Sequence, residues 1–189
     1  VATSACAAPK KNSIQIKGSD TMVNLAQSWA EKYMEANPAE FVAVTGGGSG
    51  TEIAALISGS CDLAQSSRDV SPEERATAAA KGVDIHETTA GYDGIAVVVN
   101  PANPINRLTL DQLSDIFTGR VTNWKELGGE DKPILILSRE RNSGTHIFFL
   151  EHVLRHGKAK GPEEFSNNAL MMPSNQAIVQ EVQSSEAAI

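Results

Sequence analysis

The feature that most constrains the fold is a repeated succession of a strand, a turn rich in glycine and hydroxyl residues, and a helix start. The first copy begins with the alternating segment Ser13–Ile16, turns at Gly18–Thr21 and enters a helix that Asn37-Pro38 should end. A second strand, Phe41–Val44, follows at once. Strands and helices that alternate in this way predict an α/β fold with a mainly parallel sheet flanked by helices.

The same pattern continues along the chain, and we expect the chain to cross over at Gly91–Gly94. The further elements that we expect are a short helix face at Ile53–Ile57, a strand at Leu63–Gln65, a helix that starts at Ser71-Pro72, a buried strand at Ile95–Val99, a helix at Thr109–Phe117, a helical turn at Asn123–Leu127, a buried strand at Ile134–Leu137, and helices at His146–His156 and Ser174–Val182.

Three turns of this pattern are candidates for an anion site: Gly18–Thr21, Gly48–Thr51 and Ser143–Thr145. Each helix start offers unpaired N–H groups and about half a positive charge, and each hydroxyl adds a donor. In an open α/β sheet such turns lie at the carboxyl ends of strands, where ligands bind. The alternative is that each serine or threonine is only a helix cap. Three such turns with glycine adjacent favour binding.

Two arginines follow expected strands and stand close to these turns. Arg139 precedes Ser143 by four residues, and a guanidinium there can pair with an oxyanion in bidentate fashion. We therefore assign Arg139 to the site. Arg68 follows Ser66-Ser67, and for it both binding and a surface role stay open.

Composition and motifs exclude other classes of function. The net charge of −7 argues against nucleic acid as a partner, because the phosphate backbone requires a basic face. The turn Gly46–Thr51 lacks the Gly-Lys-Ser/Thr ending of a phosphate-binding P-loop, and a dinucleotide fingerprint is also missing. His152 and His156 lack the glutamate spacing of a zinc motif, so we expect no metal and no cofactor.

The two cysteines are too few for a disulfide scaffold. Cys61 is expected to be a buried free thiol, with a Cys6–Cys61 disulfide as the alternative. Residues 1–12 are expected to form a flexible segment. A remnant of an export signal, with Cys6 as a lipid-anchor cysteine, is the competing interpretation.

Several motifs in a fixed order resemble the substrate-binding proteins of phosphate ABC transporters. They are Ile16–Met22, Thr45–Thr51, Asp62–Arg68, Leu113–Trp124, Ser143–Thr145 and Met172–Val182. The resemblance implies a two-lobed, periplasmic-binding-protein-like architecture with a hinge, in which residues 13–91 form the first lobe and residues 92–189 the second. It also implies a protein outside the cytoplasm that is not an enzyme, captures inorganic phosphate and delivers it to a membrane permease.

Carried over onto this sequence, the resemblance implies phosphate contacts from both lobes. Together with Arg68, the candidate residues are Ser19, Asp20, Thr21, Ser49, Ser67, Arg139, Ser143, Gly144 and Thr145. The alternatives to a phosphate receptor are a phosphate-ester hydrolase that uses the same anion site and a receptor for another oxyanion such as sulfate.

Two departures from the family pattern affect these expectations. Some members carry an aspartate that accepts the proton of hydrogen phosphate, and Ser67 holds that place here. The residues Asp20, Asp69 and Glu140 are then the open candidates for the acceptor. Members of the family also continue past Ala188-Ile189, so we expect the C-terminal portion of the architecture to be missing from this sequence.

Overall fold

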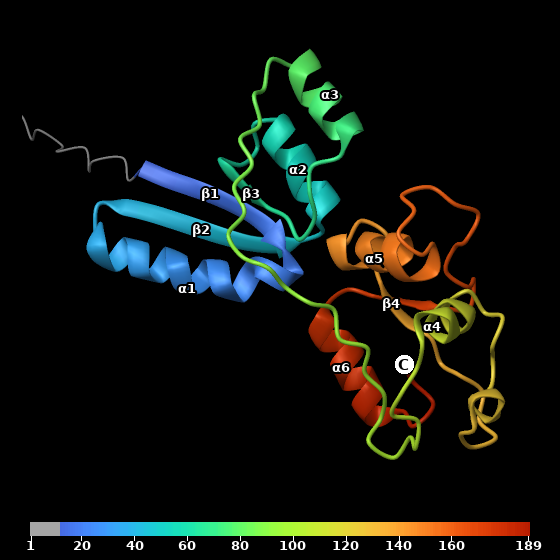
Figure 1. The fold of residues 1–189 in the computed structure, drawn as a ribbon. Helices are drawn as coiled ribbons and strands as arrows, with labels where there is room; N and C mark the ends of the chain where they lie inside the picture. The colour runs from blue at the N-terminus through green and yellow to red at the C-terminus, as the bar shows by residue number, and fades with distance from the viewer. Residues whose placement is uncertain (1–11) are drawn as a thin grey trace, which may run out of the picture.

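The computed structural model describes residues 12–189, and its elements form two lobes joined by an extended connection (Figure 1). The first lobe contains β1 (Asn12–Ser19), α1 (Asp20–Ala36), β2 (Glu40–Gly47), α2 (Ser49–Ile57), β3 (Leu63–Gln65) and α3 (Pro72–Ala80). The second contains α4 (Leu110–Phe117), the 3-10 turn η1 (Trp124–Leu127), β4 (Leu137–Arg139), α5 (Gly144–Phe149), the π-helical turn η2 (Leu150–Leu154), β5 (Leu170–Met172) and α6 (Asn175–Ser184).

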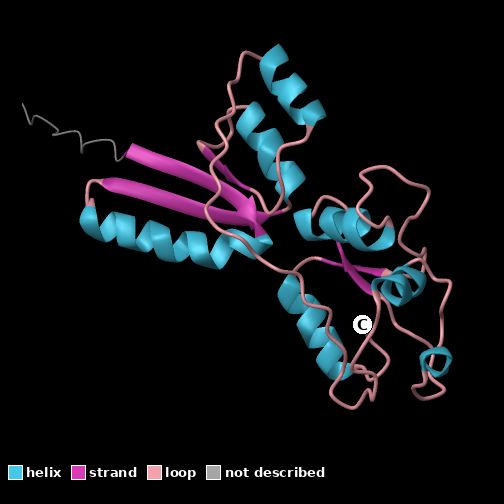
Figure 2. Cartoon of the chain, in the orientation of Figure 1, coloured by secondary structure: helices cyan, strands magenta, loops and turns pink. Residues whose placement is uncertain are grey.

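Both sheets are parallel, which confirms the predicted fold class. In the first lobe the strand order is β2-β1-β3, and in the second β4 pairs with β5 (Figure 2). The register places Ser19 opposite Gly47 and Gly18 opposite both Gly46 and Gln65. The three strands of the first lobe therefore end at one edge, and the turns into α1 and α2 leave from that edge together.

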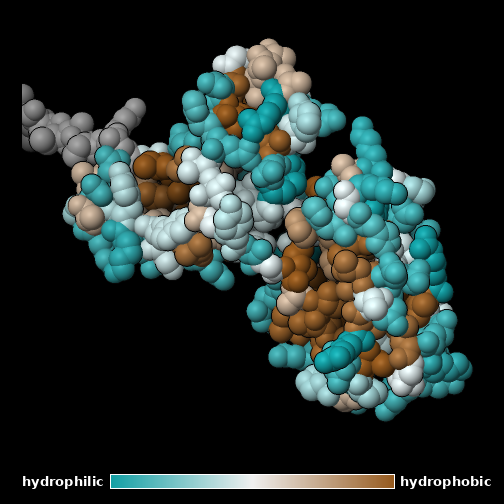
Figure 3. Space-filling view, viewed as in Figure 1, coloured by the Kyte–Doolittle hydropathy of each residue, from teal (hydrophilic) through white to brown (hydrophobic). Residues whose placement is uncertain are grey.

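Each lobe has its own hydrophobic core. In the first lobe Ile53 and Ile57 of α2 pack with Ala78 of α3. The second lobe has a larger core, with Ile116, Trp124 and a group of aromatic side chains at its centre. Figure 3 shows hydrophobic residues gathered over the visible face of the second lobe, whereas the first lobe presents a mixed surface. Separate cores allow the lobes to act as two bodies.

The connection between α3 and α4 corrects one expectation. The predicted buried strand Ile95–Val99 is wrong, because in the described part of the chain this segment is extended but pairs with no strand. The side chains of Ile95, Val97 and Val98 are 37–40% exposed. A strand needs the hydrogen bonds of a neighbour, and neither sheet offers one here. The division at residues 91 and 92 stays a prediction.

The second lobe differs from the sequence expectation in three details. The expected strand Ile134–Leu137 begins later, as β4, although Leu135 forms an isolated bridge with Ala188. The expected helix His146–His156 is divided into α5 and the π-helical turn η2. Strand β5 was not expected at all, because three residues carry too little periodicity to detect.

Candidate functional site

The helix starts of this protein are of two kinds. The starts of α3, α4 and α6 are capped by the side chains of Ser71, Thr109 and Ser174, each of which accepts a hydrogen bond from a backbone N–H of the first turn. The starts of α1, α2 and α5 have no side-chain cap, although Ser19 and Ser143 stand at the capping position of α1 and α5. Capping therefore does not account for the hydroxyls of the three predicted turns.

Two of these hydroxyls, those of Ser19 and Ser49, form a cluster with the hydroxyl of Ser67 at the edge of the first lobe. The hydroxyl of Ser19 donates to Ser67 Oγ at 3.1 Å, and the Oγ atoms of Ser67 and Ser49 lie 3.3 Å apart. The backbone N–H of Ser67 also donates to Ser49 Oγ, at 3.2 Å. Ser19 and Ser49 are buried. Since hydroxyl groups rotate, this cluster can turn donors toward an anion without moving its backbone.

The second lobe brings α5 directly against this cluster. A Cβ atom at Gly144 would lie 2.2 Å from Ser67 Oγ and 2.8 Å from Ser49 Oγ, so only glycine permits this approach. Beside it, the hydroxyls of Thr145 and Thr21 lie 3.4 Å apart across the two lobes. The predicted residues Ser143, Gly144 and Thr145 thus face the predicted residues of the first lobe.

Arg139 provides the positive charge at this junction. It ends β4, its side chain is 3% exposed, and its Nη1 donates to Asp20 at 3.3 Å and to the Asn175 side chain at 2.6 Å. Its Nη2 donates to the carbonyl of Pro173 at 3.2 Å. Arg139 Nε is buried and has no hydrogen-bond partner among the described residues. A buried donor without a partner costs about 1–3 kcal/mol, which an acceptor from a bound anion would recover.

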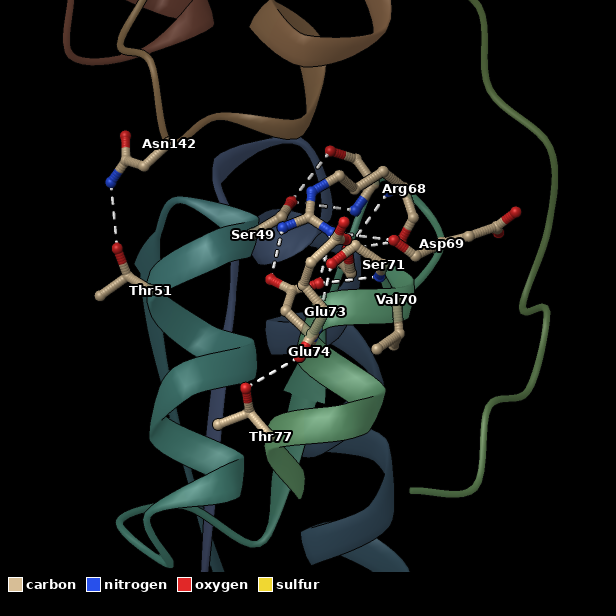
Figure 4. A network of polar contacts seen from close by, with 12 residues as sticks. Ser49, Thr51, Arg68, Asp69, Val70, Ser71, Glu73, Glu74, Thr77 and Asn142 are labelled. Carbon is tan, nitrogen blue, oxygen red and sulfur yellow. Dashed lines mark hydrogen bonds and ion pairs between the residues drawn. The ribbon is translucent and has the colours of Figure 1, made fainter. Parts of the chain in front are cut away.

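Arg68 has a different environment, shown in Figure 4. Its guanidinium forms a two-pronged ion pair with Glu74, with distances of 2.8 and 2.7 Å, and Nη1 also donates to the carbonyl of Asp69. The hydrogen bond to Glu74 raises the pKa of Arg68, and the same bond lowers the pKa of Glu74. Of the nitrogens of this guanidinium, Nε is buried and has no hydrogen-bond partner among the described residues. Arg68 therefore ties β3 to α3, and its binding role stays a prediction.

Two asparagines that the sequence reading did not single out also connect the lobes. Asn142 accepts a hydrogen bond from the N–H of Gly50 through its carbonyl, at 3.2 Å, and its side chain donates to Thr51 at 3.0 Å (Figure 4). On the other side of the cluster, the Asn175 N–H donates to Asp20 at 3.0 Å. Each of these asparagines stands beside a predicted turn or helix start, and this position is the signal by which the sequence could have identified them.

Two further groups near the site are buried and titratable. Glu52, on α2, is 3% exposed, its Oε2 has no hydrogen-bond partner among the described residues, and burial raises its pKa. His146, on α5, lies 3.0 Å from Ser138 Oγ through Nδ1, and burial lowers its pKa. Ser138 and His146 are both about 6% exposed.

Within residues 12–189, no group of three or more histidine, cysteine, aspartate or glutamate residues is placed to hold a metal ion. No helix in that range has the length and apolar character needed to cross a membrane. Cys61 is a buried free thiol, as expected, and burial raises its pKa. Cys6 and the segment around it lie outside the described residues.

Comparison with protein families gives a match to the PBP superfamily domain over residues 3–189. Among curated proteins, the chain is 37% identical over 159 residues to the phosphate-binding protein PstS of Bacillus subtilis, which covers 84% of this chain and 52% of that protein. It is 31% identical over 181 residues to PstS of Pseudomonas aeruginosa, covering 89% of this chain and 54% of that one. The chain therefore spans about half the length of these curated relatives.

Solved structures agree with this result. A substrate-binding protein of a phosphate ABC transporter from Clostridium perfringens, described with bound phosphate, matches 94% of this chain with a TM-score of 0.83 and 35% identity, over 68% of its own chain. An ABC-type phosphate transport receptor from Vibrio cholerae matches 94% with a TM-score of 0.69 and 34% identity, over 69% of its own chain.

Proposed function

The chain belongs to the PBP superfamily, and from this premise we propose that it binds inorganic phosphate between its two lobes and delivers it to the membrane permease of an ABC transporter. The observation that carries the proposal is the convergence of three helix starts without side-chain caps on one hydroxyl cluster, with the buried Arg139 at its margin. Uncapped helix starts, hydroxyls and a guanidinium are the donors that a tetrahedral oxyanion requires.

The residues that we propose as phosphate contacts are those expected from the sequence: Ser19, Asp20, Thr21, Ser49, Ser67, Arg68, Arg139, Ser143, Gly144 and Thr145. Among them, Arg139 supplies the charge and the hydroxyls supply directional hydrogen bonds. The partners follow from the same proposal: the phosphate ligand and a permease, with the protein acting outside the cytoplasmic membrane. Lipid anchoring through Cys6 belongs to this proposal as well.

Calorimetric titration of the full-length protein with phosphate and with sulfate tests the proposal. We expect heat with phosphate, and we expect Arg139→Met to weaken binding at least about a hundredfold, because it removes a charged and buried hydrogen-bonding partner. Arg120→Met is the matched control, since Arg120 pairs with Asp115 on the surface with 58% of its side chain exposed. Absence of phosphate binding in the unmodified protein would refute the function.

The two other candidates are separated by their own measurements. A phosphate-ester hydrolase would turn over a chromogenic phosphate ester and lose that turnover in Arg139→Met, whereas we expect no turnover. A receptor for another oxyanion would bind sulfate more tightly than phosphate in direct competition. We expect phosphate to displace sulfate.

A further inference from the structure

The start of α2 receives its hydrogen-bond acceptor from the other lobe. The backbone N–H of Gly50, in the first turn of α2, donates to the carbonyl oxygen of Asn142 at 3.2 Å. Asn142 lies between β4 and α5 in the second lobe, and its side-chain Nδ2 donates to Thr51 Oγ1 at 3.0 Å (Figure 4). One residue of the second lobe thus bonds to two successive residues of a helix start in the first lobe.

Gly48 occupies the capping position of α2 and shows that Asn142 has taken the place of a cap. The backbone of Gly48 is extended, with φ −98° and ψ 142°, so the backbone conformation does not require glycine here. A Cβ atom at Gly48 would lie 2.7 Å from both Cγ and Nδ2 of Asn142 and 3.0 Å from its carbonyl oxygen. Asn142 therefore excludes the side chain that would cap α2, and its carbonyl accepts from an N–H that such a cap would use.

The bonds of Asn142 join residues of different lobes, so separation of the lobes must break both of them. Asn142 and Thr51 are exposed, which places this contact at the rim of the junction. Neither residue is among the proposed phosphate contacts, whereas the other interlobe ion pair, between Asp20 and Arg139, consists of two of them. The contact of Asn142 can therefore affect the opening of the lobes without a bond to the anion.

We propose that Asn142 is an interlobe latch, which caps α2 from the second lobe and slows the release of a bound anion without contacting it. The inference rests on the proposed function, because the latch acts on a ligand held between the lobes. Release requires the lobes to open and the latch to break, whereas association begins with the lobes apart. The latch therefore acts on the dissociation rate and leaves the association rate as it is.

The test is the rate at which radiolabelled phosphate leaves the full-length protein when excess unlabelled phosphate is added. Asn142→Ala removes the side-chain bond, and it adds no backbone strain because His156 is the only non-glycine residue in the range 12–189 with a positive φ. We expect release to be about three- to tenfold faster, which corresponds to one hydrogen bond of ordinary net strength. The association rate should stay within about twofold of the unmodified protein. An unchanged release rate would overturn the proposal.

Thr51→Val removes the acceptor on the first lobe and keeps the shape of the side chain. We expect the same acceleration of release as in Asn142→Ala. The double variant should release phosphate no faster than either single variant, because both substitutions break one and the same bond. Accelerations that multiply in the double variant would overturn the latch, since the bond between these two side chains would then not be their cause.

Asn123→Ala and Thr77→Val are the matched controls, because each makes the same substitution on a bond within one lobe. The Asn123 side chain donates to Asp131 in the second lobe, and the Thr77 hydroxyl donates to the carbonyl of Glu73 in α3. We expect both controls to release phosphate at the rate of the unmodified protein, whatever their stability in urea. Equal acceleration in the controls would refute the latch, because release would then follow general destabilisation.

Amide hydrogen exchange at Gly50 gives an independent measurement. Its N–H bonds to the carbonyl of Asn142 only while the lobes are in contact, so we expect saturating phosphate to slow its exchange. The N–H of Arg75 donates to the carbonyl of Ser71 within the first lobe and is the reference, with equal exchange in both conditions. Exchange at Gly50 that ignores phosphate would contradict the latch. A protein that binds no phosphate refutes the proposed function instead, and that result is distinct from an unchanged release rate in Asn142→Ala.

Discussion

The helix starts that meet at the hydroxyl cluster and the starts of α3 and α4 satisfy their backbone donors in different ways. At α3 and α4, Ser71 and Thr109 complete capping boxes with Glu74 and Gln112, in which side chain and backbone bond reciprocally. At the hydroxyl cluster, α1, α2 and α5 have no side-chain cap. A serine before a helix can thus cap that helix or bond to another element, and its hydrogen-bond partner shows which role it has.

This difference has an energetic meaning. A side-chain cap contributes about 0.5–2 kcal/mol to stability, so three helix starts without caps forgo several contributions of that size. The hydroxyl of Ser19 instead donates to Ser67, which follows β3. The starts at the hydroxyl cluster therefore give up part of their intrinsic stability, which is the expected cost if these groups serve binding.

Among the helix starts, the largest effect is expected at the closest approach between the lobes. In Gly144→Ala, the new methyl group would lie 2.2 Å from Ser67 Oγ and 2.8 Å from Ser49 Oγ, so the lobes could not come together without displacing the hydroxyl cluster. We expect phosphate binding to weaken by about 2 kcal/mol, or roughly thirtyfold, as measured by calorimetry.

Gly50→Ala is the comparison at the neighbouring uncapped start. A Cβ there would lie 3.6 Å from Arg68 Nη2 and 3.7 Å from the Asn142 carbonyl, which are ordinary contacts. We expect at most about a threefold change in phosphate affinity for this variant. Equal losses in the two variants would show that any side chain at these starts is harmful, and the close packing of Gly144 on the serines would lose its significance.

A medium effect should separate the two kinds of helix start. Thr109→Ala removes the side-chain cap of α4, which does not contact the proposed site. We therefore expect a loss of about 1 kcal/mol in the free energy of unfolding and an unchanged phosphate affinity. Ser19→Ala removes no cap, so we expect phosphate binding to weaken by about 1 kcal/mol, with a smaller change in stability.

Urea unfolding and calorimetry on both variants measure these quantities. The distinction between capped and uncapped helix starts would be wrong if Ser19→Ala destabilises the protein as much as Thr109→Ala and leaves phosphate binding intact. In that case the hydroxyl of Ser19 would serve the fold in the way a cap does.

The sequence predicted the parallel architecture because period and turn chemistry are local signals. The strand Ser13–Ile16 and the helix end at Asn37-Pro38 appear where expected, as part of β1 and at the end of α1. The prediction of a strand at Ile95–Val99 was wrong for a nonlocal reason. An apolar run favours a strand, but a strand forms only where a neighbouring strand provides its hydrogen bonds.

The same limit applies to the site. Turn composition and strand order were sufficient to predict that the starts of α1 and α2 meet, since strands of one parallel sheet end at one edge. The start of α5 follows a strand of the other sheet, so its place opposite them was expected only from the family resemblance. Turn composition and strand order favoured Arg139 over Arg68 only because Arg139 stands close to the turn at Ser143, and they left the role of Arg68 open. The structure separates them by their partners, Glu74 within one lobe and Asp20 across the two lobes. The asparagines Asn142 and Asn175 were missed because their contacts join segments far apart in sequence.

The smallest effect concerns pH and the capped start of α3. Glu74 accepts hydrogen bonds from Arg68 and Ser71, and the bond from Arg68 is the main reason that its pKa lies below the ordinary 4.5. A carboxyl whose pKa is lower in the folded state contributes stability above the unfolded value, and this contribution is lost as the pH falls through the folded value. For a partly buried pair we expect it to be about 1 kcal/mol.

The unmodified protein should therefore lose this contribution between pH 4.5 and more acidic conditions, whereas Glu74→Gln should lack it throughout. The measurement is the difference in unfolding free energy between the two proteins, determined in urea at pH 7 and at pH 3.5. Because Glu74 is the carboxyl of a capping box, this difference reports the electrostatic part of a side-chain cap. A difference that stays constant with pH would assign the stabilisation to hydrogen bonding alone, and the ion pair with Arg68 would then contribute no net stability.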